Sequence, residues 1–393
     1  MNFNLSLYFK LICHSFFRAR RTPCKLSGAR LKFLLTSGLV GYPLLEAVHR
    51  LGFAVDEVFH RRFRHIEVRE PVFIIAPNRS GTTLLVNTLA QDQRFTAPRM
   101  WEYFFAPAIS ERKAIWGIGA IGAKLGIPFP KILANIEQSF ANNPANQMYY
   151  KAHRLTLNGI EEDNLYLLHN CSVYDLAGMF PFRELIFDYA DYDRKIPQKR
   201  KQKDMMFLKR MVQRHLAAHP GKRYLSKMTT LSSAVPSVLA TFPDAKIIHL
   251  VRHPVKVVPS SVKLWMGHWI RNGCTGNLKE LVPMIVEHNK IWYERLHQDT
   301  AHLPPTQYIR VAYNDLVRDI EATVSKIYEQ FDIPITEEVH AGLKEAKEKQ
   351  KKFRSENKYS LEEVGLSMEQ LAKAFAEIAP AYGFTFPPAE PAL

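Results

Sequence analysis

Short apolar runs alternate with amphipathic segments along most of this chain. Four of the runs predict buried strands, and each precedes a turn and a pattern that fits a helix; they lie near residues 72–76, 223–227, 246–251 and 307–311. Strands that alternate with helices in this way favour a parallel sheet joined by right-handed crossovers. The expected fold class is therefore α/β, with a parallel sheet flanked by helices.

The segments outside this alternation predict two additions to the α/β core. Residues 1–70 precede the first strand and are expected to form an N-terminal helical extension. The α/β domain itself is expected over residues 71–393, and within it the stretch from about 110 to 220 predicts a mainly helical insertion. With 393 residues, of which 47% are hydrophobic, the chain can bury a sizeable core.

The first predicted strand runs into a turn that is typical of an anion-binding site. Gly81 lacks a Cβ where a bound anion would approach the backbone, and the amides of Ser80–Thr83 would point at it from the start of a helix. A loop for nucleoside triphosphates carries a Lys before its Ser or Thr. Here Thr82 and Thr83 follow the glycine directly, and the cation is Arg79. The loop therefore predicts an oxyanion site that requires no metal.

A second strand-to-helix segment carries a second cation. Arg252 follows the predicted strand 246–251, and Pro254 suits the first position of a helix, which places Ser260 within its first two turns. Open parallel sheets bind ligands just outside the carboxyl ends of their strands. We therefore expect Arg252 and Arg79 to face one crevice from neighbouring strands.

The segment Pro77–Leu85, Pro-Asn-Arg-Ser-Gly-Thr-Thr-Leu-Leu, resembles the 5'-phosphosulfate loop of sulfotransferases that use 3'-phosphoadenosine-5'-phosphosulfate (PAPS), in the bacterial and tyrosylprotein branch. In that family an Arg followed eight residues later by a Ser holds the 3'-phosphate, and Arg252 and Ser260 have this spacing. The resemblance implies a P-loop-like fold and PAPS as co-substrate, with no metal required. It assigns to the 5'-phosphosulfate the residues Arg79, Ser80, Gly81, Thr82 and Thr83.

The same resemblance supplies two candidates for the chemistry. Lys227 ends a predicted strand where the family places a Lys, although Met228 and Thr229 replace the Pro or Asp-Pro that usually follows. As a point charge it is expected to stabilise the departing phosphate. Glu102 lies in the segment where relatives carry a Glu that acts as the base. His153 is the alternative base.

A further match, weaker than the others, lies between these segments. Residues 151–154 and Asn158–Asp163, Asn-Gly-Ile-Glu-Glu-Asp, resemble a region of the family that carries a His and an acidic cluster. The second stretch brings three acidic residues close together at 161–163.

The charge balance agrees with an anionic ligand. Lys and Arg number 53 against 38 Asp and Glu, a net charge of +15 that would attract PAPS, sulfated glycans, nucleic acid or acidic lipid headgroups. No nucleic-acid module pattern accompanies it, so no nucleic-acid partner is expected. The four cysteines are too scattered for a metal site and too few for a disulfide framework. A reducing compartment, hence the cytoplasm, is the default expectation.

The N-terminal extension leaves two alternatives open. Its longest uncharged stretch, Phe33–Leu45, is shorter than the roughly 20 residues that span a bilayer, so we expect no transmembrane helix. Residues 3–17 are rich in Phe and Leu and precede Arg18 and Arg20. This segment either rests on an anionic membrane, as a peripheral contact, or packs as a helix over the catalytic domain.

The sequence as a whole favours a sulfotransferase that moves a sulfuryl group from PAPS to an acceptor hydroxyl by in-line displacement. The acceptor is a small molecule, a lipid or a glycan, and the insertion at about 110–220 is expected on its side of the site. Two alternatives stay open. One is a P-loop kinase or NTPase, which would need magnesium, and the other is a non-catalytic basic protein that binds membranes or polyanions.

Overall fold

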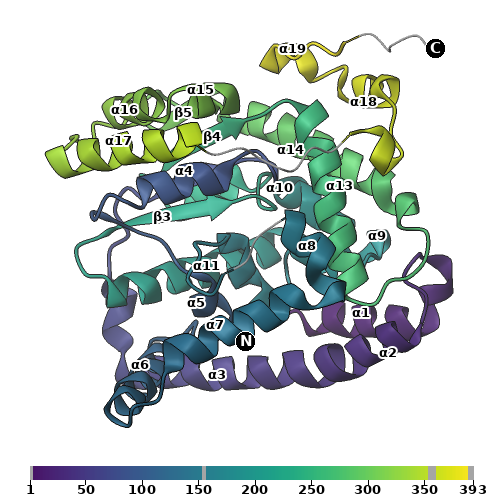
Figure 1. Cartoon of the computed structure of the whole chain (residues 1–393), viewed down its shortest axis with the longest axis horizontal. Coiled ribbons are helices and arrows are strands. Elements are labelled where there is room, and N and C mark those ends of the chain that lie inside the picture. The colour runs from purple at the N-terminus through teal and green to yellow at the C-terminus, as the bar shows by residue number, and fades with distance from the viewer. Residues whose placement is uncertain (1–2, 153–155, 353–359, 388–393) are drawn as a thin grey trace.

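Five parallel strands lie at the centre of the molecule, a computed structural model that describes residues 3–152, 156–352 and 360–387 (Figure 1). Their order across the sheet is β2-β3-β1-β4-β5. The bounds are β1 (Val72–Ile75), β2 (Phe95–Thr96), β3 (Arg223–Met228), β4 (Lys246–Val251) and β5 (Tyr308–Ala312). The α/β class and the four predicted strands are confirmed, whereas β2, with 2 residues, was missed.

Strand β1 is buried on both faces, which is what its uninterrupted apolar run predicts. Alternate side chains enter two different cores, Phe73 and Ile75 in one and Val72 and Ile74 in the other. The second core is closed by α4 (Thr82–Leu89), α15 (Tyr313–Arg318), α16 (Ile320–Gln330) and α17 (Glu337–Lys352). The first, larger core is closed by α11 (Gln198–Ala218), α12 (Val235–Thr241), α13 (Pro254–Arg271), α14 (Val282–Thr300), α18 (Met368–Phe375) and α19 (Ala379–Tyr382).

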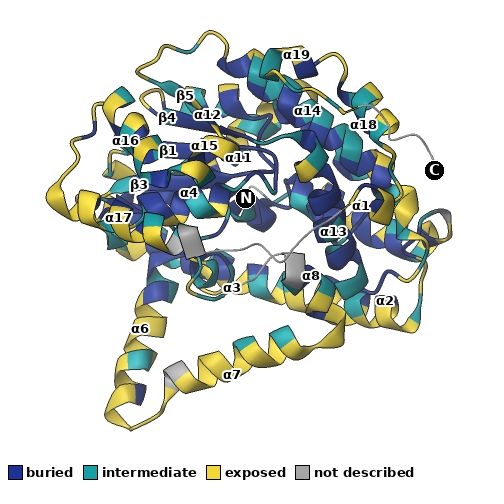
Figure 2. Cartoon of the chain, turned by 45° about the horizontal axis from the view of Figure 1, so that its top comes forward, coloured by how far each residue is buried: buried dark blue, intermediate teal, exposed yellow. Residues whose placement is uncertain are grey.

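The chain between β2 and β3 is folded from helices and short 3-10 turns. The α-helices are α5 (Met100–Phe104), α6 (Ile109–Lys124), α7 (Phe129–Asn142), α8 (Gln147–Ala152), α9 (Arg183–Ile186), α10 (Tyr192–Lys195) and then α11. Between α8 and α9 lie the turns η5 (Asp163–Asn170) and η6 (Tyr174–Gly178). Helices α6 and α7 form a hairpin that projects from the body of the molecule (Figure 2).

The N-terminal extension packs against the α/β domain. Helix α1 (Leu5–Phe17) buries Leu11 completely, and the amide of Asn4 at its N-cap donates to the carbonyl of Asn170 at 2.8 Å. Of the two alternatives for this segment, packing as a helix is therefore the one that the structure adopts.

A continuous helical segment follows, from Gly28 to Phe59, built from α2 (Gly28–Phe33), the π-helical η2 (Leu34–Gly41) and α3 (Tyr42–Phe59). Its 32 residues are enough, by length and composition, to cross a membrane. The expectation of no transmembrane helix rested on the uncharged stretch alone, and the helix continues beyond that stretch in both directions.

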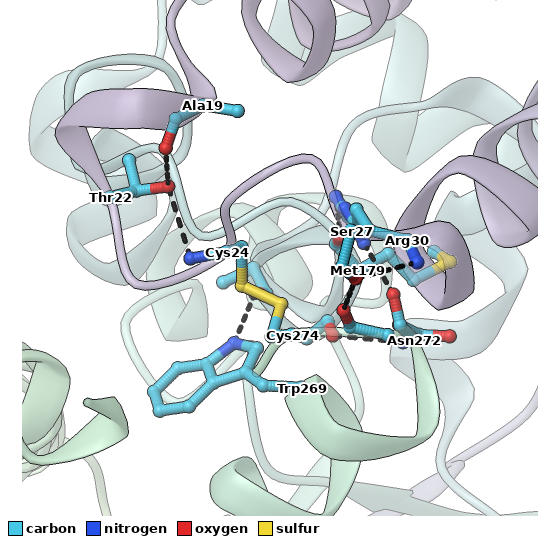
Figure 3. Close-up of a disulfide and its surroundings, with 12 residues drawn as sticks. Ala19, Thr22, Cys24, Ser27, Arg30, Met179, Trp269, Asn272 and Cys274 are labelled. Carbon is cyan, nitrogen blue, oxygen red and sulfur yellow. Dashed lines mark hydrogen bonds between the residues drawn. A yellow bond between two sulfur atoms is a disulfide. The ribbon is translucent and has the colours of Figure 1, made fainter. Parts of the chain in front are cut away.

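A disulfide joins this extension to the α/β domain. Cys24, just before α2, is bonded to Cys274, just after α13, across a sequence separation of 250 residues (Figure 3). Beside it the Arg30 guanidinium donates to the carbonyls of Asn272 at 2.9 Å and Met179 at 2.8 Å. The scattered cysteine spacing did not predict this pair, because only the tertiary fold brings its two partners together.

We expect replacement of Cys24 by Ser to lower the free energy of unfolding by about 2–4 kcal/mol, since the link closes a very long loop in the unfolded chain. Denaturant unfolding followed by circular dichroism measures this loss. Cys13→Ser, at an exposed free cysteine, is the matched control and should leave stability unchanged. Thiol titration of the unfolded wild type should find only two reactive cysteines before reduction; four would mean that the bond is absent.

Candidate functional site

A cavity of about 410 Å³ opens at the carboxyl ends of the central strands. Its walls come from the loops after β1 and β4, from α5, α8 and α13, and from the η5 and η6 region. Arg79, Gly81, Thr82, Thr83 and Arg252 line it. The two loops that sequence patterns selected therefore meet at one site, as parallel sheets favour.

The loop after β1 has the backbone of an anion cradle. Gly81 has a φ of 97°, and a Cβ there would lie 2.5 Å from the Tyr313 ring, so a glycine is required both for conformation and for space. Helix α4 begins at the next residue, Thr82, and its first amides have no partner within the helix. An anion in the loop would receive these amides and the positive end of the helix dipole.

Arg79, Arg252 and Ser260 are in direct contact with one another. The Nε of Arg79 donates to Ser260 Oγ at 2.9 Å, and Nη1 of Arg252 donates to the Arg79 carbonyl oxygen at 2.8 Å. The Arg252 guanidinium also lies 4.1 Å from the centre of the Tyr313 ring, a cation–π contact. The residues predicted for the two phosphate groups thus form one connected cationic end of the cavity.

Lys227 lies beside this end, buried with 1% of its side chain exposed. Its Nζ is 3.4 Å from Glu161 Oε2, 3.7 Å from Glu162 Oε1 and 3.5 Å from Thr83 Oγ1. Burial disfavours the ammonium, but the charges of Glu161 and Glu162 outweigh it and raise the pKa of Lys227. Lys227 is therefore a fixed cation next to the phosphate loop.

Three carboxylates line the cavity, namely Glu161 and Glu162 beside Lys227, and Asp175. Burial, followed by the charge of Glu162, raises the pKa of Asp175 to about 7. Asp175 Oδ2 accepts hydrogen bonds from Thr230 Oγ1 at 2.5 Å and from Asn164 Nδ2 at 2.9 Å. These contacts hold a carboxyl that titrates near neutral pH in one orientation at the cavity wall.

Glu102 does not line the cavity. Its Oε1 lies 3.1 Å from Arg112 Nη1 and 3.2 Å from His215 Nδ1, while its Oε2 accepts from the Arg99 amide at 2.7 Å as the N-terminal cap of α5. Burial alone would raise the pKa of Glu102, but the hydrogen bond and charge of His215 and the charge of Arg112 lower it to about 2. This environment suits a structural ion pair better than a base.

The same cluster has the ligand types of a metal site. Single ligand atoms of Glu102, His215 and His219 all lie within 4.8 Å of one another. However, the Arg112 guanidinium already holds the carboxylate, and a cation placed there would face its positive charge. The cluster is therefore a poor host for a metal ion.

The acidic cluster was only partly visible in the sequence. Asn158–Asp163 matched a family landmark and contains Glu161 and Glu162, but nothing around Asp175 marked it. His153, the alternative base, lies outside the described residues. An apolar part of the cavity wall is formed by Met100, Phe104, Leu165, Leu168, Met179, Leu264 and Trp265, and polar groups of Tyr149, His268 and Arg271 line it as well.

A sequence model described as the sulfotransferase family matches residues 71–337, more than half of the chain. The chain belongs to the sulfotransferase family. The family resemblance drawn from the two loops is thereby confirmed. The match includes both loops and Lys227, so the candidate site of this sulfotransferase lies within the residues that the family model covers.

Relatives of known sequence and structure agree. The omega-hydroxy-beta-dihydromenaquinone-9 sulfotransferase Stf3 of Mycobacterium bovis is 26% identical over 303 residues, covering 74% of this chain and 71% of that protein. The crystal structure of sulfotransferase STF9 from Mycobacterium avium superposes with a TM-score of 0.74 at 17% identity and covers 98% of both chains. Sulfotransferase STF1 from Mycobacterium tuberculosis H37Rv gives a TM-score of 0.66 at 18% identity, covering 94% of this chain and 98% of that one. The two structures establish that the fold is shared.

We expect Glu102→Gln to lower the free energy of unfolding by about 3 kcal/mol, because it leaves the buried Arg112 without its counter-charge. The pKa of Glu102 is lowered from an ordinary value of 4.5 to about 2. Its ionised form therefore stabilises the wild type above about pH 4.5, and this contribution is lost as the pH falls toward 2.

Urea unfolding at pH 7 and at pH 3 measures both effects on Glu102→Gln. The difference between the variant and the wild type should shrink at the lower pH. Glu369→Gln, at an exposed position in the first turn of α18, is the control and should match the wild type at both pH values. Equal stability of Glu102→Gln and wild type at pH 7 would contradict a structural ion pair.

Proposed function

We propose that this sulfotransferase transfers the sulfuryl group of PAPS to a hydroxyl group of an acceptor with an apolar body. The observation that carries the proposal is the convergence of Arg79, Arg252 and the amide cradle of α4 at one end of the cavity, with Lys227 beside them. PAPS has two anionic groups, the 5'-phosphosulfate and the 3'-phosphate, and needs such paired anion sites.

The two anions have separate partners in this proposal. The 5'-phosphosulfate lies in the loop, held by the backbone of Ser80–Thr83 and by Arg79, and the hydroxyls of Thr82 and Thr83 add donors. The 3'-phosphate is held by Arg252 and Ser260. Because Arg79 and Ser260 are hydrogen-bonded to each other, binding of one phosphate orders the partner of the other.

Asp175 takes the acceptor proton in this proposal. The acceptor oxygen attacks sulfur in line as its proton moves to the carboxylate, and the bond from sulfur to the bridging phosphate oxygen breaks. Lys227 stabilises the charge on the phosphate that leaves as 3'-phosphoadenosine-5'-phosphate. A carboxyl with a pKa of about 7 is well matched to proton transfer at neutral pH, which favours Asp175 over the ion-paired Glu102.

The acceptor is inferred from the apolar part of the cavity wall. Phe104, Leu165, Leu264 and Trp265 offer no hydrogen-bonding side chain except the indole, so they suit hydrocarbon. The relative Stf3 acts, by its name, on an omega-hydroxylated dihydromenaquinone, a hydroxyl at the end of an apolar body. An acceptor of this kind would place its hydroxyl near Asp175 and its body along the apolar wall.

Calorimetric titration with 3'-phosphoadenosine-5'-phosphate, without metal, tests the donor site. We expect micromolar binding to the wild type and at least tenfold weaker binding to Arg252→Ala, since a charge-assisted phosphate contact contributes about 1.5–3 kcal/mol. Arg318→Ala, at an exposed arginine that pairs with Asp315, is the control and should bind as the wild type does. Magnesium-dependent binding of ATP with equal affinity would instead favour a kinase or NTPase.

Transfer from radiolabelled PAPS to an omega-hydroxylated isoprenoid quinol in detergent tests the base. We expect Asp175→Asn to lower kcat by about 100-fold or more while leaving nucleotide affinity unchanged. The carboxylate form accumulates as the pH rises through about 7, so wild-type kcat/KM should rise with pH to a plateau above that value. Asp175→Asn should lose this rise. If folded Glu102→Gln lost most of its kcat while Asp175→Asn stayed active, Glu102 and not Asp175 would be the base that takes the acceptor proton.

A further inference from the structure

Helix α3 has its apolar residues on the exposed side and most of its charged residues on the buried side, which is the reverse of an ordinary surface helix. Between residues 33 and 59 every exposed side chain is uncharged, and the large ones include Leu35, Leu39, Leu44, Val48, Leu51 and Val58. On α3 itself these positions recur at intervals of three, four and seven, which places them along one side of the helix. A helix that covers the core of a water-soluble domain normally exposes its charges instead.

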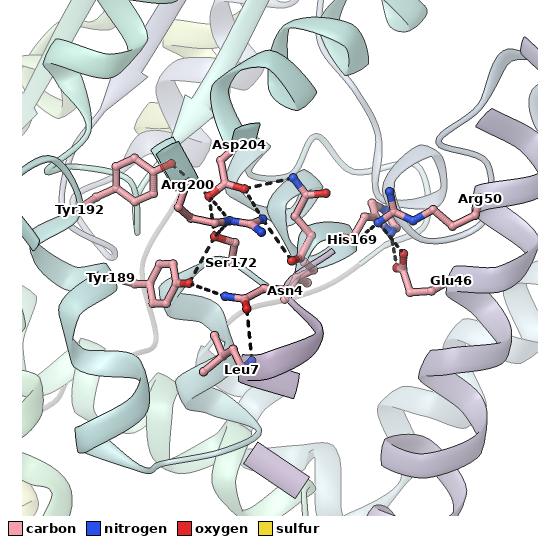
Figure 4. Close-up of polar contacts among 12 residues, drawn as sticks. Asn4, Leu7, Glu46, Arg50, His169, Ser172, Tyr189, Tyr192, Arg200 and Asp204 are labelled. Carbon is pink, nitrogen blue, oxygen red and sulfur yellow. Dashed lines mark hydrogen bonds and ion pairs between the residues drawn. The ribbon is translucent and has the colours of Figure 1, made fainter. Parts of the chain in front are cut away.

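Glu46, His49 and Asp56 of α3 are buried in the protein, and Arg50 and Glu57 are partly buried. Glu46 accepts from His169 at 2.6 Å, with Arg50 next to it on the same helix (Figure 4). Farther along, His49 Nδ1 lies 2.7 Å from Glu111 Oε1, and Asp56 Oδ2 accepts from Arg214 Nε at 2.9 Å. These buried pairs attach α3 to the domain through its polar side and leave the apolar side outward.

The neighbouring α6–α7 hairpin is apolar and exposed on nearly all sides (Figure 2). Trp116, Ile118, Ile121, Leu125, Ile132 and Ile136 are all exposed, by between 41% and 71%. Between residues 114 and 136 the only charged side chains are Lys124 and Lys131. The exposed apolar side chains of this projecting hairpin therefore do not pack into a hydrophobic core.

The two surfaces are adjacent. Ser110, at the start of α6, donates through Oγ to the carbonyl of Gly52 in α3 at 3.1 Å, and both elements lie along the lower side of the molecule in Figures 1 and 2. The exposed side of residues 35–58 and the exposed side chains of residues 116–136 are together called the apolar face. An apolar face of this extent marks an interaction site.

The apolar face is also connected to the cavity. The Arg271 guanidinium lies 5.8 Å from the ring of Phe140, near the end of α7, and 4.8 Å from the ring of Tyr149. Both Arg271 and Tyr149 line the cavity. The hairpin therefore leads, through α8, directly to the wall at which the acceptor is proposed to bind.

We propose that the apolar face lies on an anionic lipid bilayer, with α3 parallel to the membrane plane and the α6–α7 hairpin inserted among the lipids, so that a lipid acceptor enters the cavity from the bilayer. The docking itself stands independently of the reaction; only the entry of an acceptor rests on the proposed function. An amphipathic helix with a continuous apolar side and basic flanks is the form that binds at a membrane interface.

Charge complementarity favours a bilayer as the occupant. Exposed Lys25 and Lys32 precede the apolar part of the long helix, and exposed Arg61, Arg62 and Arg64 follow it. These five residues and the hairpin's Lys124 and Lys131 place cations beside the apolar face, where anionic headgroups would bind them, and the net charge of the chain, +15, acts in the same direction. A location in the membrane plane also keeps the buried pairs of Glu46, His49 and Asp56 inside the protein, whereas a spanning helix would carry them into hydrocarbon.

Tryptophan fluorescence with phosphatidylglycerol vesicles, without nucleotide, tests the docking. Among the 5 tryptophans Trp116 is 49% exposed, while Trp101 is half-buried and the other three are buried. We expect a blue shift on vesicle addition and quenching by brominated acyl chains. Trp116→Phe should remove the signal yet still float with the vesicles. Neutral phosphatidylcholine vesicles should bind at least tenfold more weakly.

Two double variants locate the surface, Val48→Glu with Leu51→Glu in α3 and Ile118→Glu with Ile121→Glu in α6. Each should lower vesicle binding at least tenfold while melting like the wild type and binding 3'-phosphoadenosine-5'-phosphate equally well. Ile335→Glu, 43% exposed between α16 and α17 across the sheet, is the matched control and should bind vesicles fully.

Unchanged vesicle binding by both folded variants, or no binding by the wild type, overturns the proposal. A wild-type dimer in sedimentation velocity that the variants convert to monomer, without vesicle binding, would assign the apolar face to a second copy of the chain and overturn it too. Failure of the proposed function shows separately, as absence of nucleotide binding in calorimetry with vesicle binding intact.

Discussion

The site depends on one constraint, the parallel pairing of β1 with β3 on one side and β4 on the other. The register places Ile74 opposite Lys227 in β3, and Ile75 opposite His249 in β4. All three strands therefore end at the same edge of the sheet. Because of this, an anion loop and an arginine that are far apart in sequence share one cavity, and a buried lysine lies beside the loop. The apolar core on each face of β1 maintains that register, since a shift by one residue would exchange its two sets of side chains.

The charges along the cavity organise the proposed chemistry. Arg79 and Arg252 form its cationic end, Lys227 lies beside them, and Asp175 is on the cavity wall. An anionic donor is attracted to the arginines, whereas the Asp175 carboxyl, held by Thr230 and Asn164, is the group proposed to receive the proton of a neutral hydroxyl. Lys227 is paired with Glu161 and Glu162 before any ligand arrives, and this pairing holds its ammonium within reach of the phosphate loop.

Features with a local signature could be predicted from the sequence. Short stretches of sequence were enough for three features, because each is defined by local spacing. They are the four apolar strands, Gly81 before a helix, and Arg252 eight residues before Ser260. The base could not be chosen in this way, because a Glu at the third position of a helix caps its amides whether or not a cavity lies nearby. Glu102 differs from Asp175 because it is ion-paired with Arg112 and His215, which come from other helices. Those partners are not apparent from the sequence around Glu102. The bond between Cys24 and Cys274 and the polarity of α3 likewise depend on partners distant in sequence.

Arg79 has a φ of 70°, a left-handed conformation that costs a residue with a Cβ about 1 kcal/mol or more. The hydrogen bonds from Arg252 to its carbonyl and from its own Nε to Ser260 oppose that cost. Arg252 therefore stabilises the conformation of the loop as well as binding a phosphate in the proposal. The nucleotide affinity lost when Arg252 is replaced would combine the missing phosphate contact with a change in the backbone of the loop. An asparagine at position 79 tolerates the same φ and lacks the guanidinium, so it separates conformation from charge at this site.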